Sequence, residues 1–322
     1  MEAVIETRGL TKHFGKIRAV ENVSLRIERG EIYGFLGLNG AGKTTTIRML
    51  LGMIRPTRGE VFLEGTRVHS GRRSLWNRVG FMVEVPSAYP DLTVFENVDM
   101  FRRLRFMKDS RAVDRVLAQL KLTQYRNRPA RHLSLGNFQR LGLAKALLHE
   151  PEILILDEPA NGLDPAGIVE IRLLLRELAQ HRGVTILISS HILGEISKIA
   201  TRIGIIHEGR LIRESATAEL DQERRRSLKV RTRDLDAARA LLACEGFTGV
   251  DGGQGEIEIT DERVIADPAI VSTLLVRREL PPIMLQVEEE DLESYFFRVI
   301  RVEPAAVESA ALRAAGRGRR KK

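Results

Sequence analysis

The sequence predicts an α/β protein whose main part is built on a parallel sheet buried on both faces, followed by a small α+β domain. Three observations support this fold class. Short apolar runs alternate with helical patterns from the start of the chain to about residue 215. A glycine-rich stretch, GLNGAGKTT at 37–45, joins one apolar run to a helix-like segment. After about residue 220 the spacing of strand-like and helix-like segments changes.

The apolar runs define the expected strands in order. They cover residues 22–28, 30–36, 59–65, 78–84, 152–157, 184–190 and 202–209. The first alternates apolar and polar residues as a half-buried strand does, whereas the last three are continuous apolar runs typical of a buried parallel sheet. From residue 93 to about residue 122 apolar residues recur at three- and four-residue spacings, which predicts a helical insertion between strands.

The C-terminal part has its own pattern. Residues 228–232 and 256–260 are strand-like, 234–246 is helix-like, and 290–300 is amphipathic. We therefore expect a small separate α+β domain over residues 228–302. The tail, 303–322, is expected to be basic and disordered, with a lipid or nucleic-acid contact as the alternative.

Composition limits the class of protein. The 322 residues are 43% hydrophobic, which supports a large domain with a core plus a smaller one. The one cysteine, Cys244, excludes an intrachain disulfide framework and is expected to be a small buried residue. No apolar run approaches about 18 residues and the N-terminus is acidic, so we expect a soluble, cytoplasmic chain. The net charge of +8 suits an anionic partner, yet no nucleic-acid motif accompanies it.

The stretch from residue 37 to residue 45 has the spacing of a phosphate-binding P-loop. Glycines let successive N–H groups turn around a phosphate chain, and the helix N-terminus adds partial positive charge. Lys43 would reach the β and γ phosphates, and the Thr44 hydroxyl would hold Mg²⁺. A glycine-rich turn with an incidental lysine is the alternative. The expected binding residues are Gly37, Leu38, Asn39, Gly40, Ala41, Gly42, Lys43, Thr44 and Thr45.

A second signal is PEILILDEPANGLDP at 151–165. The apolar run 153–156 would bring Asp157 and Glu158 to the carboxyl end of a strand, where ligands bind in open α/β sheets. Asp157 would bind Mg²⁺, and Glu158 would orient the attacking water and accept its proton.

A third stretch, LSLGNFQR at 133–140, has the features of a second anion site. Ser134 can cap the following helix, and Gly136 leaves N–H groups free at the helix start. A plain capped helix is an equally good interpretation from these residues alone.

Taken in order, the P-loop, LSLGNFQR, ILILDEP, NGLDP and SSH resemble the nucleotide-binding subunit of an ABC transporter, across nearly all of residues 1–220. The resemblance implies a P-loop NTPase cassette with a RecA-like core and a helical subdomain at about 85–150. It also implies that two cassettes face each other head to tail. Each ATP then lies between one chain's P-loop and the signature of the other, so Ser134 and Gly136 would bind the partner's nucleotide.

The resemblance assigns further roles by position. Phe14 matches the aromatic residue that stacks on adenine, although a core phenylalanine is the alternative. Asp164 resembles the dimer-interface residue of the D-loop, although Asp-Pro also starts ordinary helices. His191 resembles the switch histidine that contacts the γ-phosphate. Asp157 is the Walker B aspartate, and Glu158 resembles the catalytic base.

Two departures from the family pattern stand out. Glu84 occupies the place of the Q-loop glutamine, so a metal contact there keeps an acceptor oxygen but adds a charge. Leu135 and Asn137 stand where the signature usually has glycine and glutamine. Both variants, and the small C-terminal domain, resemble a branch of bacterial exporters linked to bacitracin resistance and lantibiotic self-protection.

These features together predict an ATPase subunit that hydrolyses MgATP as a homodimer and drives export through a separate membrane-spanning permease. The subunit would lie at the inner face of the cell membrane, with the coupling contact at the loop from Glu84 to Pro90 and the helical segment after it. A cassette ATPase acting on nucleic acid or the ribosome is the alternative. A switch GTPase is a third option, although no NKxD guanine-reading motif occurs. Nothing in the sequence indicates the transported compound.

Overall fold

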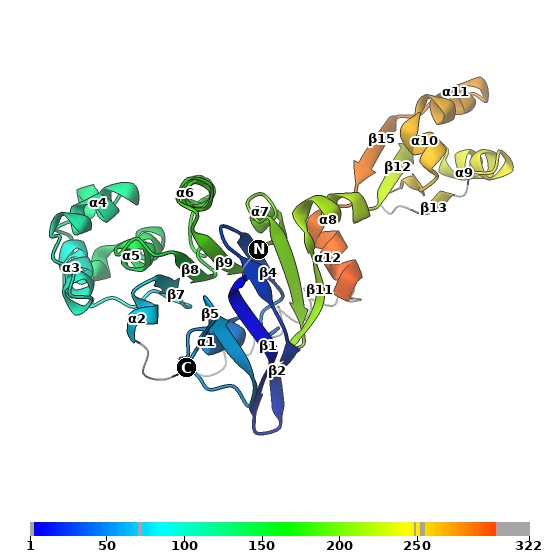
Figure 1. Cartoon of the computed structure of the whole chain (residues 1–322). Coiled ribbons are helices and arrows are strands. Elements are labelled where there is room, and N and C mark those ends of the chain that lie inside the picture. Colours follow the sequence, from blue (N-terminus) through cyan, green and yellow to red (C-terminus); the bar gives the residue numbers. More distant parts are fainter. Residues whose placement is uncertain (1–2, 70–72, 248, 252–254, 301–322) are drawn as a thin grey trace, which may run out of the picture. The chain divides into compact units, whose positions relative to one another are not determined.

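The computed structural model describes residues 3–69, 73–247, 249–251 and 255–300. The chain divides into two compact units, residues 1–219 and 220–322 (Figure 1), and each is described by itself. Among the described residues, none of the helices combines the length and apolar character needed to cross a bilayer. The expected basic tail, 303–322, lies outside the described residues.

The first unit begins with an antiparallel sheet. Its strands are β1 (Ala3–Phe14), β2 (Ile17–Val23), β3 (Arg26–Glu28), β5 (Arg58–Leu63) and β6 (Thr66–Arg67), in the order β2-β1-β5-β6 with β3 also on β1. The expectation that strands and helices alternate from the start is therefore wrong, because no described helix precedes Lys43. The single strand expected at 22–28 is also wrong. Asn22 has a left-handed φ of 54°, and the segment divides between β2 and β3.

The parallel sheet confirms the buried strands that the apolar runs predict. Its order is β11-β10-β4-β9-β8-β7, and only β11 runs antiparallel to its neighbour. The strands are β4 (Ile32–Leu36), β7 (Val79–Met82), β8 (Ile153–Asp157), β9 (Thr185–Ser190), β10 (Arg202–His207) and β11 (Arg210–Ala216). Every residue of β4, β8 and β9 is buried, as expected for strands covered on both faces.

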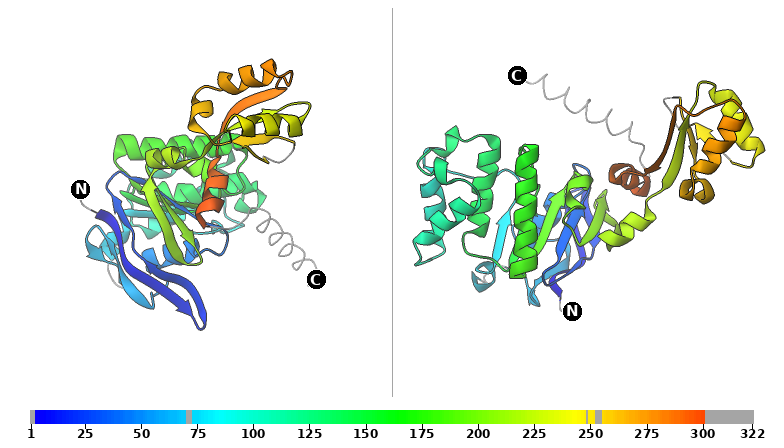
Figure 2. Two further views of the ribbon diagram at one scale, coloured as in Figure 1. Left: turned by 90° about the vertical axis from the view of Figure 1, so that its right-hand side faces the viewer. Right: turned by 90° about the horizontal axis from the view of Figure 1, so that it is seen from above.

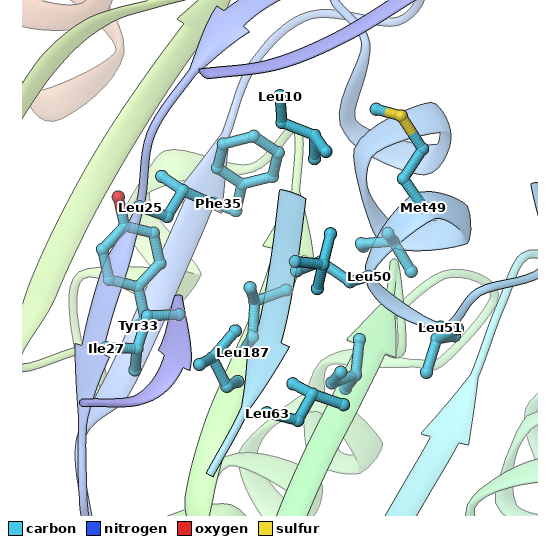
Figure 3. Packing of buried hydrophobic residues seen from close by; sticks show 14 of the residues in the cluster. Leu10, Leu25, Ile27, Tyr33, Phe35, Met49, Leu50, Leu51, Leu63 and Leu187 are labelled. Atoms are coloured by element: carbon cyan, nitrogen blue, oxygen red, sulfur yellow. The ribbon is translucent and has the colours of Figure 1, made fainter. Parts of the chain in front are cut away.

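Helices cover this sheet. The helix α1 (Lys43–Leu50) contacts both sheets, whereas α6 (Pro165–Arg182) and α7 (Leu193–Ile196) pack against β9 on the other face (Figure 1). A short α2 (Arg73–Trp76) precedes β7, and α8 (Thr217–Glu223) spans the boundary between the units. The core between the sheets combines side chains of β1, β4, β5 and α1, among them Leu10, Phe35, Met49 and Leu63 (Figure 3).

The expected helical insertion is confirmed. It contains α3 (Val94–Leu104), α4 (Arg111–Gln119), the 3-10 turns η1 (Thr123–Tyr125) and η2 (Ala130–His132), and α5 (Leu135–Leu147). The three helices gather beside β7, at the edge of the parallel sheet (Figures 1 and 2). Thr93 and Glu96 form a reciprocal capping box that starts α3.

The second unit follows a β-α-β-β-α-β pattern in which two helices precede the last strand and a further helix follows it. Its strands are β12 (Arg226–Arg231), β13 (Gly249–Asp251), β14 (Ile257–Ile259) and β15 (Met284–Glu289); its helices are α9 (Leu235–Cys244), α10 (Glu262–Ala266), α11 (Ala269–Arg277) and α12 (Leu292–Ile300). The antiparallel order β13-β14-β12-β15 is the split βαβ arrangement of ferredoxin-like domains. Leu228, Val230, Ile257 and Ile259 form the core with residues of α9 and α11.

One composition-based expectation is wrong in this unit. Cys244 ends α9 and is exposed rather than buried, because the helix directs Ala238 and Leu242 into the core instead. An amphipathic helix of this length has one buried stripe, and Cys244 falls outside it.

Candidate active site

The P-loop joins β4 to α1, as the sequence predicts. Gly42 precedes α1 with a φ of 108°, which side-chain-bearing residues rarely adopt. A Cβ at Gly42 would lie 2.6 Å from the Ala19 carbonyl oxygen, and one at Gly37 would lie 2.5 Å from the Ile206 carbonyl oxygen. The loop therefore needs glycine at both positions, and the nine expected binding residues, 37–45, form one continuous segment around the start of α1.

Lys43 is held under this loop. Its side chain is only 6% exposed, and Nζ donates to the carbonyl oxygens of Gly37 (2.6 Å) and Leu38 (3.3 Å). The same Nζ lies 3.2 Å from Glu158 Oε1, as an ion pair rather than an aligned hydrogen bond. The structure thus places a cation where the loop curves, together with the carboxylate predicted to be the base.

The aspartate predicted to bind Mg²⁺ lies beside α1. Asp157 is buried at the end of β8, and its Oδ2 accepts a hydrogen bond from Thr44 Oγ1 at 2.7 Å. Its Oδ1 accepts a short hydrogen bond from Ser189 Oγ on β9. The two predicted metal-binding groups are therefore in direct contact, because β8 and α1 bring residues distant in sequence together.

Ser189 was not predicted from the sequence as a site residue. Besides donating to Asp157, its hydroxyl accepts a hydrogen bond from the Glu158 backbone N–H at 3.0 Å. This residue of the neighbouring strand therefore contacts both acidic residues, and its carbonyl oxygen also accepts from the Glu158 N–H at 3.2 Å. The signal in the sequence was its position at the end of the apolar run 184–190, next to the run that ends in Asp157.

The backbone and the carboxylate of Glu158 are both held in defined positions. Its φ is 52°, in the left-handed region. Oε1 lies beside Lys43, and Oε2 is 2.8 Å from Nδ1 of His191. Both carboxylate oxygens of Glu158 therefore lie beside basic side chains, one from α1 and one just beyond β9.

A second residue that was not predicted from the sequence contacts the backbone of Glu158. Gln139, buried in α5, donates from Nε2 to the Glu158 carbonyl oxygen at 3.2 Å. Its neighbour Arg140 donates to Glu170 of α6 at 2.8 Å. The helix that begins at Ser134 is therefore fastened to the segment that follows β8.

The segment predicted to bind the partner's nucleotide lies elsewhere in the chain. Ser134 caps α5 by accepting from the Asn137 N–H at 3.3 Å, and Asp164 caps α6 by accepting from the Gly167 N–H at 2.9 Å. Ser134, Gly136 and Asp164 line a common cavity of about 600 Å³. In the described part of the chain, no residue of 37–45 lines it. The P-loop and the signature segment are thus not brought together within one chain.

Phe14 ends β1 at the tip of the β1–β2 hairpin. Its side chain is 48% exposed, and Lys12 Nζ lies 5.0 Å from the ring centroid. The alternative that Phe14 is a core residue is therefore wrong. An exposed aromatic face remains available for stacking.

Glu84 lies just beyond β7. It has a φ of 56°, and its Oε1 pairs with Nη2 of Arg48 on α1 at 2.8 Å. Among the described residues, no hydrogen bond or ion pair joins Glu84 to Thr44 or Asp157.

The donor set fits magnesium held partly by phosphate. No group of three or more His, Cys, Asp or Glu side chains capable of holding a metal occurs among the described residues. Mg²⁺ is usually bound through one or two protein oxygens plus substrate phosphates rather than by an all-protein cage. The adjacent Thr44 hydroxyl and Asp157 carboxylate match that requirement.

Comparisons with known proteins agree with this geometry. Residues 20–161 match the family described as "ABC transporter". The chain is 39% identical to the bacitracin transport ATP-binding protein BcrA of Bacillus licheniformis, covering 93% of this chain and 98% of that protein. It is 38% identical to the lantibiotic transport ATP-binding protein SrtF of Streptococcus pyogenes over 66% of this chain and 90% of that one. A dimeric, post-hydrolysis ATP-binding cassette bound to ADP and Pi aligns with a TM-score of 0.62 and 26% identity, covering 66% of this chain and 98% of that one.

Proposed function

The chain belongs to the ABC transporter family, as an ATP-binding subunit with ATPase activity, and we propose that it hydrolyses MgATP as a homodimer to drive export through a separate permease. One observation carries this proposal. Lys43, Thr44, Asp157 and Glu158 converge near the carboxyl ends of the inner strands β4 and β8, directly beneath a loop that accepts only glycine at its closest points.

Each residue has a distinct role at this site. Backbone N–H groups of 37–45 and the Lys43 ammonium bind the β and γ phosphates, while Phe14 stacks on the adenine. Thr44 and Asp157 hold the Mg²⁺, which when bound neutralises charge on the phosphate oxygens. Glu158 orients the attacking water and takes its proton, and His191 contacts the γ-phosphate.

The homodimer completes each site. Ser134 and Gly136 are exposed or half-buried at the start of α5, on a cavity that the same chain's P-loop does not line. We infer that they bind the γ-phosphate of the nucleotide on the partner subunit, with Asp164 at the interface. The dimeric cassette structure to which this chain is similar supports such pairing.

The permease contact is assigned to the segment 84–90 and the helices after it. Asn97 anchors this segment by accepting from the Tyr89 N–H and donating to the Tyr89 and Leu92 carbonyl oxygens. Large apolar side chains project from the same region: Val85, Tyr89, Leu104 and Phe106, the last 89% exposed. Exposed apolar groups of this kind suit a protein partner. The subunit would be held through them at the inner face of the cell membrane.

The transported compound is assigned only by class. Relatives named for bacitracin and lantibiotic transport match this chain, so we propose export of an antibiotic, peptide or lipid-like compound. Residues 1–220 would form the ATP-binding domain and 228–302 the accessory domain. No observation favours the alternative of an ATPase acting on nucleic acid or the ribosome.

The test combines two substitutions with a partner assay. Lys43→Ala should weaken ATP binding, whereas Glu158→Gln should retain binding and lose turnover. Equal loss of binding in both variants would contradict the role of Glu158 as base. Purification from membranes should recover a polytopic membrane protein with the chain, and recovery of nucleic acid instead would favour the alternative.

A further inference from the structure

The residue at position 84 carries a charge at a place where an uncharged glutamine is usual, and the structure contains a candidate for its compensation. Met82 of β7 pairs with Leu156 of β8 in parallel register. Glu84 and Glu158 each lie two residues beyond that pair, so both follow the carboxyl ends of neighbouring strands. Without compensation, Glu84 would add a negative charge to the end of the sheet that already carries Asp157 and Glu158.

The compensating cation is Arg48. Its Nη2 lies 2.8 Å from Glu84 Oε1. Arg48 is four residues after Thr44 on α1, so the two side chains share one face of that helix, with Cβ atoms about 5–6 Å apart. The hydroxyl of Thr44 in turn contacts Asp157. Through Arg48, Glu84 is therefore connected to the face of α1 that carries the expected metal-binding hydroxyl.

The pair contributes little to folding. Both side chains are partly exposed, at 40% for Arg48 and 54% for Glu84, and ion pairs in contact with solvent are weak and screened by salt. Neither residue has another ion-pair partner among the salt bridges of the described chain. Because the pair adds little to stability, its main effect is on the local electrostatic potential that a bound triphosphate experiences.

We propose that Arg48 is a positioning residue matched to Glu84. Its guanidinium cancels the charge of the added carboxylate, so that the nucleotide meets the same net charge as it would beside an uncharged glutamine at position 84. This inference rests on the proposed function of the P-loop as an ATP site. It predicts that the effect of Arg48 on nucleotide affinity depends on the presence of a carboxylate at position 84.

The experiment is a double-mutant cycle on the full chain in a Glu158→Gln background, which prevents turnover. The variants are Arg48→Gln, Glu84→Gln and the double substitution, and equilibrium binding of a fluorescent ATP analogue is measured in EDTA and in Mg²⁺. Arg55→Gln serves as the control, because it removes the same charge from a nearby exposed position with no salt-bridge partner in the described chain.

Arg48→Gln alone should weaken metal-free nucleotide binding about threefold to tenfold, as expected for one uncompensated charge near the phosphates. The double variant should return to near the parent affinity, and Arg55→Gln should change it less than Arg48→Gln does. Thermal unfolding without nucleotide should be nearly unchanged in all variants, which separates this role from a structural one.

Equal effects of Arg48→Gln with and without Glu84→Gln would overturn the inference while leaving the ATP site intact. Failure of the parent protein to bind nucleotide in either condition would instead overturn the proposed function.

Discussion

Replacing Ser189 by alanine tests the arrangement of the two acidic residues most sharply. The buried hydroxyl donates to the Asp157 carboxylate and accepts from the Glu158 N–H. A hydrogen bond to a charged group contributes about 1.5–3 kcal/mol and a neutral one about 0.5–1.5 kcal/mol. Because the Glu158 N–H also donates to the Ser189 carbonyl oxygen at 3.2 Å, Ser189→Ala should lower the free energy of unfolding mainly through the lost bond to Asp157, by about 1.5–3 kcal/mol. It should also lower kcat because Asp157 and Glu158 are held less firmly.

Ser190→Ala is the matched control. Ser190 is the next residue of β9 and is also buried, but its hydroxyl accepts from the Ile192 N–H and does not contact either acidic residue. Urea unfolding without nucleotide and steady-state ATPase assays should be measured on both variants. If Ser189→Ala changes stability and kcat no more than Ser190→Ala does, the reasoning about this hydroxyl is refuted.

Three further predictions concern the surroundings of the site. Phe14→Ala should weaken ATP binding by about 1–3 kcal/mol if the ring stacks on the base, whereas Ile17→Ala in the same hairpin should not; equal affinities of the two variants, measured by titration calorimetry, would exclude stacking. Gln139→Met should lower kcat several-fold with little change in ATP affinity, because only the backbone of Glu158 loses a donor, and a selective loss of affinity would argue against this. Burial, aided by a nearby guanidinium, lowers the pKa of His149 from 6.5 to about 4. The free energy of unfolding should therefore fall by on the order of 3 kcal/mol as the pH falls from 6.5 to 4, because the unfolded chain takes up the proton first. Urea unfolding of His149→Gln should lack most of that loss.

Local sequence was sufficient for much of the site. The P-loop could be predicted because its glycine spacing lies within one short stretch. The acidic pair could be predicted because a short unbroken apolar run is typical of a buried strand, which here ends at Asp157. The caps at Ser134 and Asp164 were equally local signals.

What the sequence did not reveal depends on how distant segments meet. Ser189 and Gln139 contact the acidic residues only because β9 and α5 pack beside β8, and the pairing of Arg48 with Glu84 depends on the edge position of β7. The long strand β1 was missed because register shifts interrupt its pairing and break the simple alternation.

The central claim, that two copies of this chain close around ATP, is tested most directly by the mass of the Glu158→Gln variant in solution. With saturating MgATP, light scattering should give twice the monomer mass of 36.2 kDa, and removal of nucleotide should return the monomer. A variant that binds ATP yet stays monomeric, even with its permease in lipid, would contradict the claim.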